Sequence, residues 1–342
     1  MKFLITGVSG FVGEELVYFL QKNPKYRILG IDKNKNHELD ISKIIFKECD
    51  LTSNKDNLNN IFNQFRPDVV IHCASKILDT YDNKLIWKTN YYATKDLIEI
   101  CSKYNVKKFI FISTFSIFQK NYDHAIDENE KPSYKTTYGK TKYFTEQMLL
   151  KSNFSGDVFI LRCPIILGKK RSYRLGILLG LIKDNYNIPL IGKCKNKISF
   201  VHVVDVCRAI ENCLQFTGKS IFNIAADESE EFQYILKRLI KKVNSKSKLV
   251  HFNKSIGNLI FDLVTFLRLV PYTSYHKKIF NYSMILDTTK IKKTIKWQPT
   301  YSVEKMIEEN YLHCFQNINK NTDSFSKKKA GEGLIGVLKK II

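Results

Sequence analysis

Short apolar runs alternate with longer amphipathic runs through the first half of the chain. The apolar runs are rich in Ile, Val and Phe and are bounded by polar turns, which is typical of buried β-strands. Strands are expected at Lys2–Thr6, Tyr26–Asp32, Ile44–Cys49, Asp68–Ala74 and Lys107–Ser113, followed later by Asp157–Arg162 and Lys219–Ala225. Apolar positions at helical spacing predict helices at Val12–Lys22, Leu58–Phe65 and Leu85–Tyr104.

This alternation predicts an α/β fold, a Rossmann-type doubly wound parallel sheet with helices on both faces. We expect residues 1–167 and 200–226 to form this domain. The less regular residues 168–199 and 227–316 are expected to form a smaller C-terminal lobe that binds substrate. From Asn317 the chain becomes polar, so residues 317–342 are interpreted as a basic linker and an amphipathic tail.

Composition narrows the class of protein. The chain has 342 residues, of which 44% are hydrophobic, and this is enough for a large core. No apolar run is long enough to span a bilayer, and the opening "MKFLITG" is interpreted as a first strand rather than a secretory signal. The eight cysteines are scattered without a CxxC pair. We therefore expect reduced thiols in a cytoplasmic protein, with no disulfide framework and no metal site.

The formal net charge is +22, from 55 Lys and Arg against 33 Asp and Glu. A basic protein attracts phosphates, so nucleic-acid binding is one interpretation. No nucleic-acid motif accompanies the charge, and lysines are abundant throughout, so a lysine-covered surface is favoured and no nucleic-acid partner is expected. A basic cleft would still help to hold an anionic substrate such as a nucleotide diphosphate.

A glycine-rich turn follows the first expected strand and precedes the first expected helix, with glycines at Gly7, Gly10 and Gly13. Glycines in this context let the backbone approach a pyrophosphate. The amides of Phe11 and Val12, at the start of the helix, would point at the phosphates. Asp32 ends the second strand, where a carboxylate binds ribose hydroxyls and repels a 2′-phosphate. The pattern predicts NAD, with NADP less favoured; a tight turn without a ligand is the alternative.

Asp50 follows the third apolar run. Its carboxylate is a candidate to meet the adenine amino group, and a turn or helix-capping role is the alternative.

Tyr138 and Lys142 lie four positions apart in "TTYGKTK", so a helix would place them on one face. A phenol normally titrates near pH ~10, and a nearby ammonium favours its ionised form. Tyr138 is therefore a candidate general acid or base for a hydroxyl group. The lysine is also suited to hold the nicotinamide ribose.

These motifs form an ordered series. They are "TGVSGFVG", Asp32, "DLT" at Asp50, "VIHCAS", "TNYYATKDLIE", "FIFISTFSIF", "YGKTK", "LRCPIILG", "FVHVVDVCRAI", "FNIA" and "IKWQPTYSVEKMIEE". The series spans about residues 1 to 312 and resembles an extended short-chain dehydrogenase/reductase of the NAD-dependent epimerase/dehydratase family.

The resemblance implies roles for matching positions. Thr114 would be the catalytic hydroxyl that binds the reacting oxygen, together with Tyr138 and Lys142. Asn90 would support the geometry of the active-site helix. Further cofactor contacts are implied at Leu51, Cys73, Ala74, Ser75 and Cys163. His72 and His202 lie in apolar runs and are interpreted as structural.

The chain departs from the family pattern near the substrate. Ile165 stands where many relatives have an asparagine, Phe118 where a tyrosine is common, and Lys197 where many have arginine. A basic cluster, Lys169, Lys170, Arg171 and Arg174, is a candidate to bind a diphosphate or is a solvated loop. The candidate substrate-binding residues are Thr114, Lys169, Arg171 and Lys197.

Two apolar segments are candidate contact surfaces. Ser255–Pro271 is apolar around most of a helix and suits a lobe core, a dimer contact, a membrane contact or a pocket for a steroid-like substrate. The apolar face near Leu334–Ile342, with lysines opposite, resembles a helix on an anionic membrane or one docked on its own protein. The expected partners are therefore a second copy of the chain, in a homodimer, and the inner membrane surface, through a peripheral contact.

The sequence thus favours an NAD-dependent epimerase or oxidoreductase acting on a nucleotide-activated sugar. Dehydration is disfavoured because Phe115 and Ser116, rather than an acidic pair, follow Thr114. The alternatives are a hydroxysteroid-dehydrogenase-like or other ketone reductase, and a non-catalytic NAD(P)-binding protein.

Overall fold

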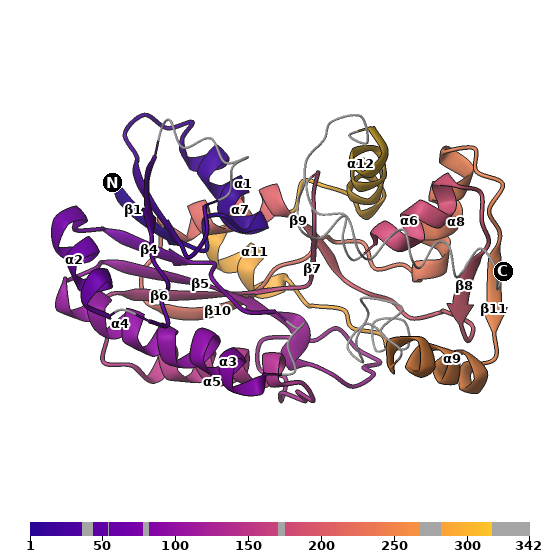
Figure 1. The fold of residues 1–342 in the computed structure, drawn as a ribbon, viewed down its shortest axis with the longest axis horizontal. Coiled ribbons are helices and arrows are strands. Elements are labelled where there is room, and N and C mark those ends of the chain that lie inside the picture. Colours follow the sequence, from indigo (N-terminus) through magenta and orange to yellow (C-terminus); the bar gives the residue numbers. More distant parts are fainter. Residues whose placement is uncertain (36–43, 54, 78–81, 170–174, 267–281, 317–342) are drawn as a thin grey trace.

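The computed structural model of the protein describes residues 1–35, 44–53, 55–77, 82–169, 175–266 and 282–316. Its larger lobe is built on a seven-stranded parallel sheet with the strand order β10-β6-β5-β4-β1-β2-β3 (Figure 1). The strands are β1 Lys2–Thr6, β2 Arg27–Asp32, β3 Ile45–Glu48, β4 Val69–His72, β5 Lys108–Thr114, β6 Asp157–Cys163 and β10 Lys219–Asn223. The predicted Rossmann-type fold class is confirmed.

The strand order reverses between β1 and β4, which pair in parallel from Phe3↔Val69 to Thr6↔His72. In open sheets of this type, ligands bind beyond the carboxyl ends of the strands at such a reversal. The glycine-rich turn after β1 and the segment after β4 both lie at this point.

Helices cover both faces of the sheet. Alternate residues of each strand point to opposite sides, and both sets are apolar, so both faces are buried. Phe3 and Ile5 of β1 pack into the core under α1 (Phe11–Leu20), α7 (Val203–Cys213) and α11 (Thr289–Ile295). Leu4 packs into a second core, on the face of α2 (Lys55–Phe65), α4 (Ala93–Lys103) and α5 (Thr137–Lys151).

The single helix expected at Leu85–Tyr104 is divided into three parts. It begins as α3 (Asn83–Trp87), passes through a π-helical turn at Lys88–Tyr92, and continues as α4. A π-turn inserts an extra residue into a helix and is frequent at functional sites. This one contains Asn90.

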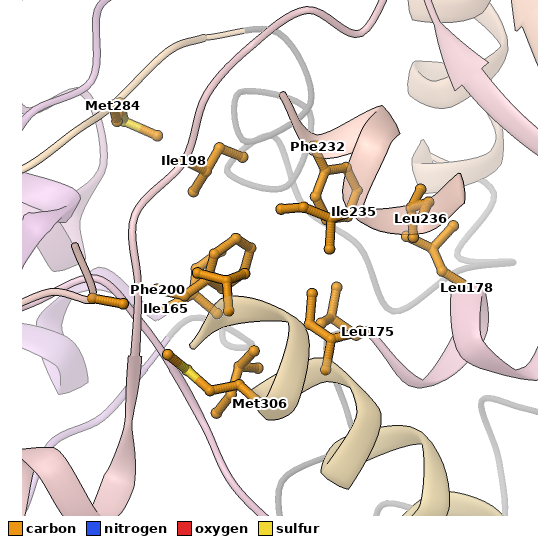
Figure 2. Close-up of a cluster of buried hydrophobic side chains, with 14 of the residues drawn as sticks. Ile165, Leu175, Leu178, Ile198, Phe200, Phe232, Ile235, Leu236, Met284 and Met306 are labelled. Carbon is orange, nitrogen blue, oxygen red and sulfur yellow. The ribbon is translucent and has the colours of Figure 1, made fainter. Parts of the chain in front are cut away.

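The smaller lobe packs around its own apolar core. Its elements are α6 (Gly176–Lys183), α8 (Phe232–Lys242), α9 (Lys254–Phe266), α12 (Val303–Gln316) and the strand pairs β7 (Ile165–Leu167) with β9 (Phe200–His202) and β8 (Ile188–Ile191) with β11 (Leu249–Phe252). Figure 2 shows this core, in which Phe200 and Met306 lie near Leu175 and Ile235.

The apolar segment predicted at Ser255–Pro271 forms α9 up to Phe266, and its remaining residues lie outside the described ones. Gly257 and Phe261 are buried, whereas Ile256 and Leu259 are exposed. The tail at 317–342 also lies outside the described residues. No helix in the described ranges is both long and apolar enough to cross a membrane.

Candidate active site

The glycine-rich turn lies directly against the end of β4. Gly7 has a φ of +68°, and a Cβ there would come within 2.6 Å of the backbone N and Cα of Ala74. A Cβ on Gly13 would lie 2.3 Å from the carbonyl oxygen of Gly7. Both positions therefore exclude any side chain.

The turn leads into the N-terminus of α1. Gly10 is the N-cap residue of α1, and no side chain caps this end of the helix. Phe11 and Val12 form the start of α1 and pack on the core that α1 shares with α7. A helix N-terminus without a capping side chain is suited to receive a phosphate group. The turn therefore fits the diphosphate of a dinucleotide.

Asp32 ends β2 with its carboxylate turned toward this turn. Its Oδ2 accepts a hydrogen bond from the Ser9 amide at 3.1 Å, and its Oδ1 accepts one from the Asn34 amide at 3.3 Å. These bonds fix the carboxylate beside the glycine turn. This position fits a ribose diol next to a diphosphate.

Asp50 is engaged in a local turn. Its Oδ1 accepts hydrogen bonds from both the amide and the hydroxyl of Thr52, each at 2.8 Å. Partial burial acts to raise the pKa of Asp50, but these hydrogen bonds and the nearby Lys33 and Lys88 hold the pKa below its ordinary value. Leu51 is half-buried against the core under α2. The adenine contact at Asp50 and Leu51 stays a prediction.

Asn90 joins the loop after β4 to the helix that carries the candidate acid–base pair. Its Oδ1 accepts from the Lys76 amide at 2.8 Å and from the Ser75 hydroxyl at 3.2 Å. Its Nδ2 donates to the carbonyl of Lys76 at 3.1 Å and to Thr141 Oγ1 at 3.3 Å. The π-turn thus directs one buried amide toward both segments, in keeping with the supporting role implied for Asn90.

His72 is part of a chain of hydrogen bonds under the same loop. Thr94 Oγ1 donates to the carbonyl of Asn90 at 2.8 Å, so it can only accept from His72 Nε2, 2.9 Å away. His72 Nδ1 then accepts from Thr6 Oγ1 at 2.6 Å, and Thr6 Oγ1 accepts from the Ala74 amide at 3.2 Å. His72 is therefore the neutral Nε2–H tautomer. Burial, and then the charge of Lys142, lower its pKa to about 3.

Tyr138 and Lys142 lie on the buried face of α5. Lys142 Nζ donates to the carbonyl oxygen of Ile112 in β5 at 2.8 Å and lies 4.3 Å from the centre of the Phe111 ring. The lysine is 2% exposed and Tyr138 is 8% exposed. Burial lowers the pKa of Lys142 to about 8, although the charge of Glu146 acts to raise it.

Thr114 ends β5, two residues beyond the carbonyl that binds Lys142. Its Oγ1 donates to Ser116 Oγ at 3.0 Å and accepts from the Ser116 amide at 3.1 Å. A Cβ on Gly139 would lie 2.4 Å from the carbonyl oxygen of Ser116, so the first turn of α5 packs directly on this segment. Thr114, Tyr138 and Lys142 therefore share one end of the β5–α5 contact.

Two thiols flank Lys142. Cys73 follows β4, and Cys163 ends β6, where it pairs with Thr114. Burial raises the pKa of the Cys73 thiol to about 12 and that of Cys163 well above its usual range. Both thiols therefore stay protonated, and neither is suited to act as a nucleophile.

A buried ion pair, which the sequence analysis missed, fixes the remainder of α5. Glu146 lies one turn beyond Lys142, and its two carboxylate oxygens accept from Arg162 Nε and Nη2 at 2.8 to 3.2 Å. Ser113 donates to Glu146 Oε1. The four-residue spacing of Tyr138, Lys142 and Glu146 carried this signal, because polar side chains repeated at that interval share one helix face.

The candidate substrate residues lie farther from this centre. Lys169 follows β7 and Lys197 precedes β9, and both are exposed. Arg171 lies outside the described residues, as do Lys170 and Arg174. No contact recorded in the described part of the chain joins Lys169 or Lys197 to Thr114. Their predicted role in binding substrate stays a prediction.

His202 has structural contacts. Its Nδ1 accepts from the Val204 amide at 3.3 Å, its ring stacks on Tyr301 at 3.6 Å, and its Nε2 lies 3.3 Å from Glu309 Oε2. Burial lowers the pKa of His202, while the charges of Glu309 and Asp205 oppose that change. The ring joins β9 to α12.

A surface hollow lies apart from the candidate active site. A shallow hollow of about 360 Å³ lies beside the end of α1, lined by Phe19, Leu20, Lys22, Asn23, Pro24, Tyr26 and Glu211. None of the candidate active-site residues lines it. Within the described ranges, no group of three or more His, Cys, Asp or Glu side chains is arranged to hold a metal ion.

Comparison with known proteins identifies the family of the chain. The model of the "NAD dependent epimerase/dehydratase family" matches residues 3–225. The UDP-glucuronate 4-epimerase of Thermodesulfobacterium geofontis is 22% identical, over 92% of this chain and 97% of that protein. The uncharacterized protein y4nG of Sinorhizobium fredii is 25% identical, over 90% of this chain and 77% of that protein.

A solved structure has the same fold. The crystal structure of UDP-glucose 4-epimerase from Thermotoga maritima, with UDP-glucose, superposes with a TM-score of 0.76 at 23% identity. The match covers 92% of this chain and 98% of that one.

Proposed function

The chain belongs to the NAD dependent epimerase/dehydratase family and is an enzyme of this NAD-dependent type, and we propose that it acts on a nucleotide-activated sugar as an epimerase or oxidoreductase. The observation that carries this proposal is that Thr114, Tyr138 and Lys142 share one end of the β5–α5 contact, where Lys142 bonds the Ile112 carbonyl and α5 packs on Ser116. The names of the similar proteins, UDP-glucuronate 4-epimerase and UDP-glucose 4-epimerase, support the substrate class.

The glycine turn and Asp32 would hold the cofactor. Gly7, Gly10 and Gly13 let the turn pack closely on itself and on Ala74. This turn would hold the diphosphate at the N-terminus of α1, and the fixed carboxylate of Asp32 would bind the adenosine ribose. A carboxylate there disfavours a 2′-phosphate, in keeping with NAD. When bound, NAD supplies the chemistry of accepting a hydride from a carbinol carbon and returning it to a keto carbon.

The side chains of the chain itself would move the proton. Tyr138 would take the proton of the sugar hydroxyl as hydride leaves the same carbon, and it would return that proton when the ketone is reduced. Thr114 would hydrogen-bond the reacting oxygen. The buried ammonium of Lys142, fixed by the Ile112 carbonyl, would favour the ionised form of Tyr138.

The neighbours of Thr114 bear on the reaction type. Phe115 and Ser116 are buried, and the Ser116 hydroxyl accepts a hydrogen bond from Thr114. This short helical segment, η2 (Phe115–Ile117), contains no carboxylic acid that could protonate a leaving hydroxyl. These residues support epimerisation, or a net oxidation or reduction, over dehydration.

Basic side chains would bind the diphosphate of the substrate. Lys169, Arg171 and Lys197 are the candidates, because the chain has Ile165 where many relatives have an asparagine that contacts this group. An excess of positive charge raises the local concentration of an anionic substrate.

The proposal also includes a homodimer. Tyr92 and Phe144 are 57% and 38% exposed, and they lie beside Tyr91 and Trp87 on the outer face of α3, the π-turn and α5. An exposed aromatic cluster is typical of a protein interface. Sedimentation of the Tyr92→Ser/Phe144→Ser double variant tests it: a dimer for wild type and a monomer for the variant support it, and a wild-type monomer contradicts it.

A ligand screen tests the proposed function. Purified protein is incubated with NAD and either UDP-glucose, UDP-glucuronic acid or a 3β-hydroxysteroid, and unfolding temperature and product formation are recorded. A ligand that binds the native state raises its unfolding temperature. Turnover of a nucleotide sugar supports the proposal. Turnover of the steroid alone would assign the reductase alternative, and NAD binding with no turnover of either nucleotide sugar would contradict the proposed substrates.

A further inference from the structure

Gln119 lies at the junction between the two elements that carry Thr114 and Tyr138. Thr114 leads into η2, and Gln119 follows η2 after one residue. The glutamine is 2% exposed. Its side chain reaches the residues just before α5, far along the chain from its own position.

The side-chain amide of Gln119 makes three hydrogen bonds there. Its Oε1 accepts from the Lys135 amide and, at 2.9 Å, from the Thr136 amide. Its Nε2 donates to Thr136 Oγ1 at 3.1 Å. Both ends of the amide are thus used, and all three bonds go to two consecutive residues.

Thr136 is the residue that starts the catalytic helix. It is the N-cap of α5, and its Oγ1 accepts from the Gly139 amide at 3.2 Å. Its carbonyl accepts from the Lys140 amide at 2.9 Å. Tyr138 lies between Thr136 and these two donors, so the position of Thr136 sets the course of the backbone that carries the phenol.

The backbone around Gln119 strengthens the junction. The Gln119 amide donates to Ser133 Oγ at 2.8 Å, and the Ser133 amide donates to the Ile117 carbonyl at 2.9 Å. The segment from Lys120 to Tyr134 leaves the junction and returns to it. The backbone amide of Gln119 therefore closes this loop at its base.

We propose that Gln119 is a positioning residue, which sets Tyr138 relative to Thr114 by clamping the N-cap of α5 to the end of η2. The inference rests on the roles that the proposed function gives to Thr114 and Tyr138. Proton transfer needs its groups within hydrogen-bond reach, and a misplacement of about 1 Å can cost roughly a hundredfold in rate. The glutamine touches no reacting atom itself; it acts through Thr136.

Gln119→Met and Gln119→Glu form a matched pair. Methionine fills the space but makes none of the three bonds. A glutamate can accept from the Lys135 and Thr136 amides, and the Thr136 hydroxyl can turn to donate to its second oxygen. We expect kcat for the nucleotide sugar that wild type turns over to fall at least tenfold in Gln119→Met and to return to within threefold of wild type in Gln119→Glu. The dissociation constant for NAD is expected to change less than twofold in both.

Gln233→Ala is the control, because Gln233 is also a buried glutamine but lies on α8, where it bonds Glu231. Its kcat is expected to equal that of wild type. A kcat within twofold of wild type in Gln119→Met, with only a lower unfolding temperature, would overturn the proposal. If Gln119→Met does not fold, Gln119→Asn, which keeps the amide but is one methylene too short, is measured against the same limits.

Amide hydrogen exchange separates this inference from the proposed function, since it needs no substrate. Loss of an N-cap contact corresponds to roughly fivefold faster opening of the first turn. We expect about that acceleration in peptides covering Gly139 and Lys140 of Gln119→Met, with Glu146–Lys151 unchanged. Unchanged exchange at Gly139 and Lys140 would overturn the clamp, whether or not wild type turns over a nucleotide sugar.

Discussion

Lys142 Nζ lies 2.8 Å from the backbone carbonyl oxygen of Ile112 and donates a hydrogen bond to it. This bond ties the helix that carries Tyr138 to the strand that ends at Thr114. It also keeps an ammonium group in a place from which water is almost fully excluded. Position and electrostatics of the candidate site therefore depend on the same side chain.

The pH dependence of stability should reveal this buried ammonium. Burial lowers the pKa of Lys142 from 10.5 to about 8. Between these values the unfolded chain keeps a proton that the folded protein has released, so the free energy of unfolding rises with pH in this window. Relative to Lys142→Met, wild type should gain up to about 3 kcal/mol between pH ~8 and ~10.5. Urea unfolding of both proteins at several pH values measures this; a constant difference would contradict it.

The acid side of the stability profile should depend on His72. Its pKa is lowered from 6.5 to about 3, chiefly by burial. As pH falls below ~6.5 the unfolded chain binds a proton that the folded protein does not bind, so stability is lost toward pH ~3, by on the order of 5 kcal/mol. His72→Gln should remove that part of the slope in urea unfolding. His124→Gln, at an exposed histidine whose pKa is raised by hydrogen bonds to Asp123 and Glu130, should keep it.

The buried pair of Glu146 and Arg162 should be essential for stability. Glu146→Gln leaves the buried guanidinium of Arg162 without its directly bonded carboxylate. We expect a loss of about 3–5 kcal/mol in the free energy of unfolding. Glu304→Gln, which breaks exposed ion pairs with Arg238 and Lys242, should change it little. Equal effects of the two substitutions would show that the Glu146 pair is not the stronger anchor.

Substitutions at Gly7 and Gly218 distinguish the effect of a steric clash from the effect of backbone strain. Both have positive φ values, +68° and +100°, but a Cβ meets the Ala74 backbone only at Gly7, and nothing lies within 4 Å at Gly218. Gly218→Ala should cost about 1 kcal/mol and leave NAD binding intact. Gly7→Ala should displace the segment after β4 and abolish NAD binding in calorimetric titration. Tight NAD binding by folded Gly7→Ala would refute this role of the turn.

Local sequence signals predicted the parts of the site that are local in structure. The glycine turn, Asp32 and the spacing of Tyr138 and Lys142 each lie within or beside one element, so the pattern of residues indicated them. The strands of the sheet were predicted to within a few residues for the same reason.

Features that depend on tertiary contact were not predicted. The apolar periodicity at Leu85–Tyr104 suits an ordinary helix, and only the packing of Asn90 between two segments reveals the π-turn. The Gln119 amide and the pairing of Glu146 with Arg162 join residues far apart in the chain. Their partners become evident only when β5, β6 and α5 are in register.

Tyr138→Phe tests the central claim most directly, since it removes only the phenolic oxygen. The variant and wild type are compared for NAD affinity by titration and for turnover of UDP-glucose or UDP-glucuronic acid, whichever wild type converts. We expect NAD affinity within twofold of wild type and kcat lowered at least a hundredfold, the usual contribution of a positioned acid or base. A variant that binds NAD normally and keeps its turnover would contradict the assignment of Tyr138 as the group that moves the proton.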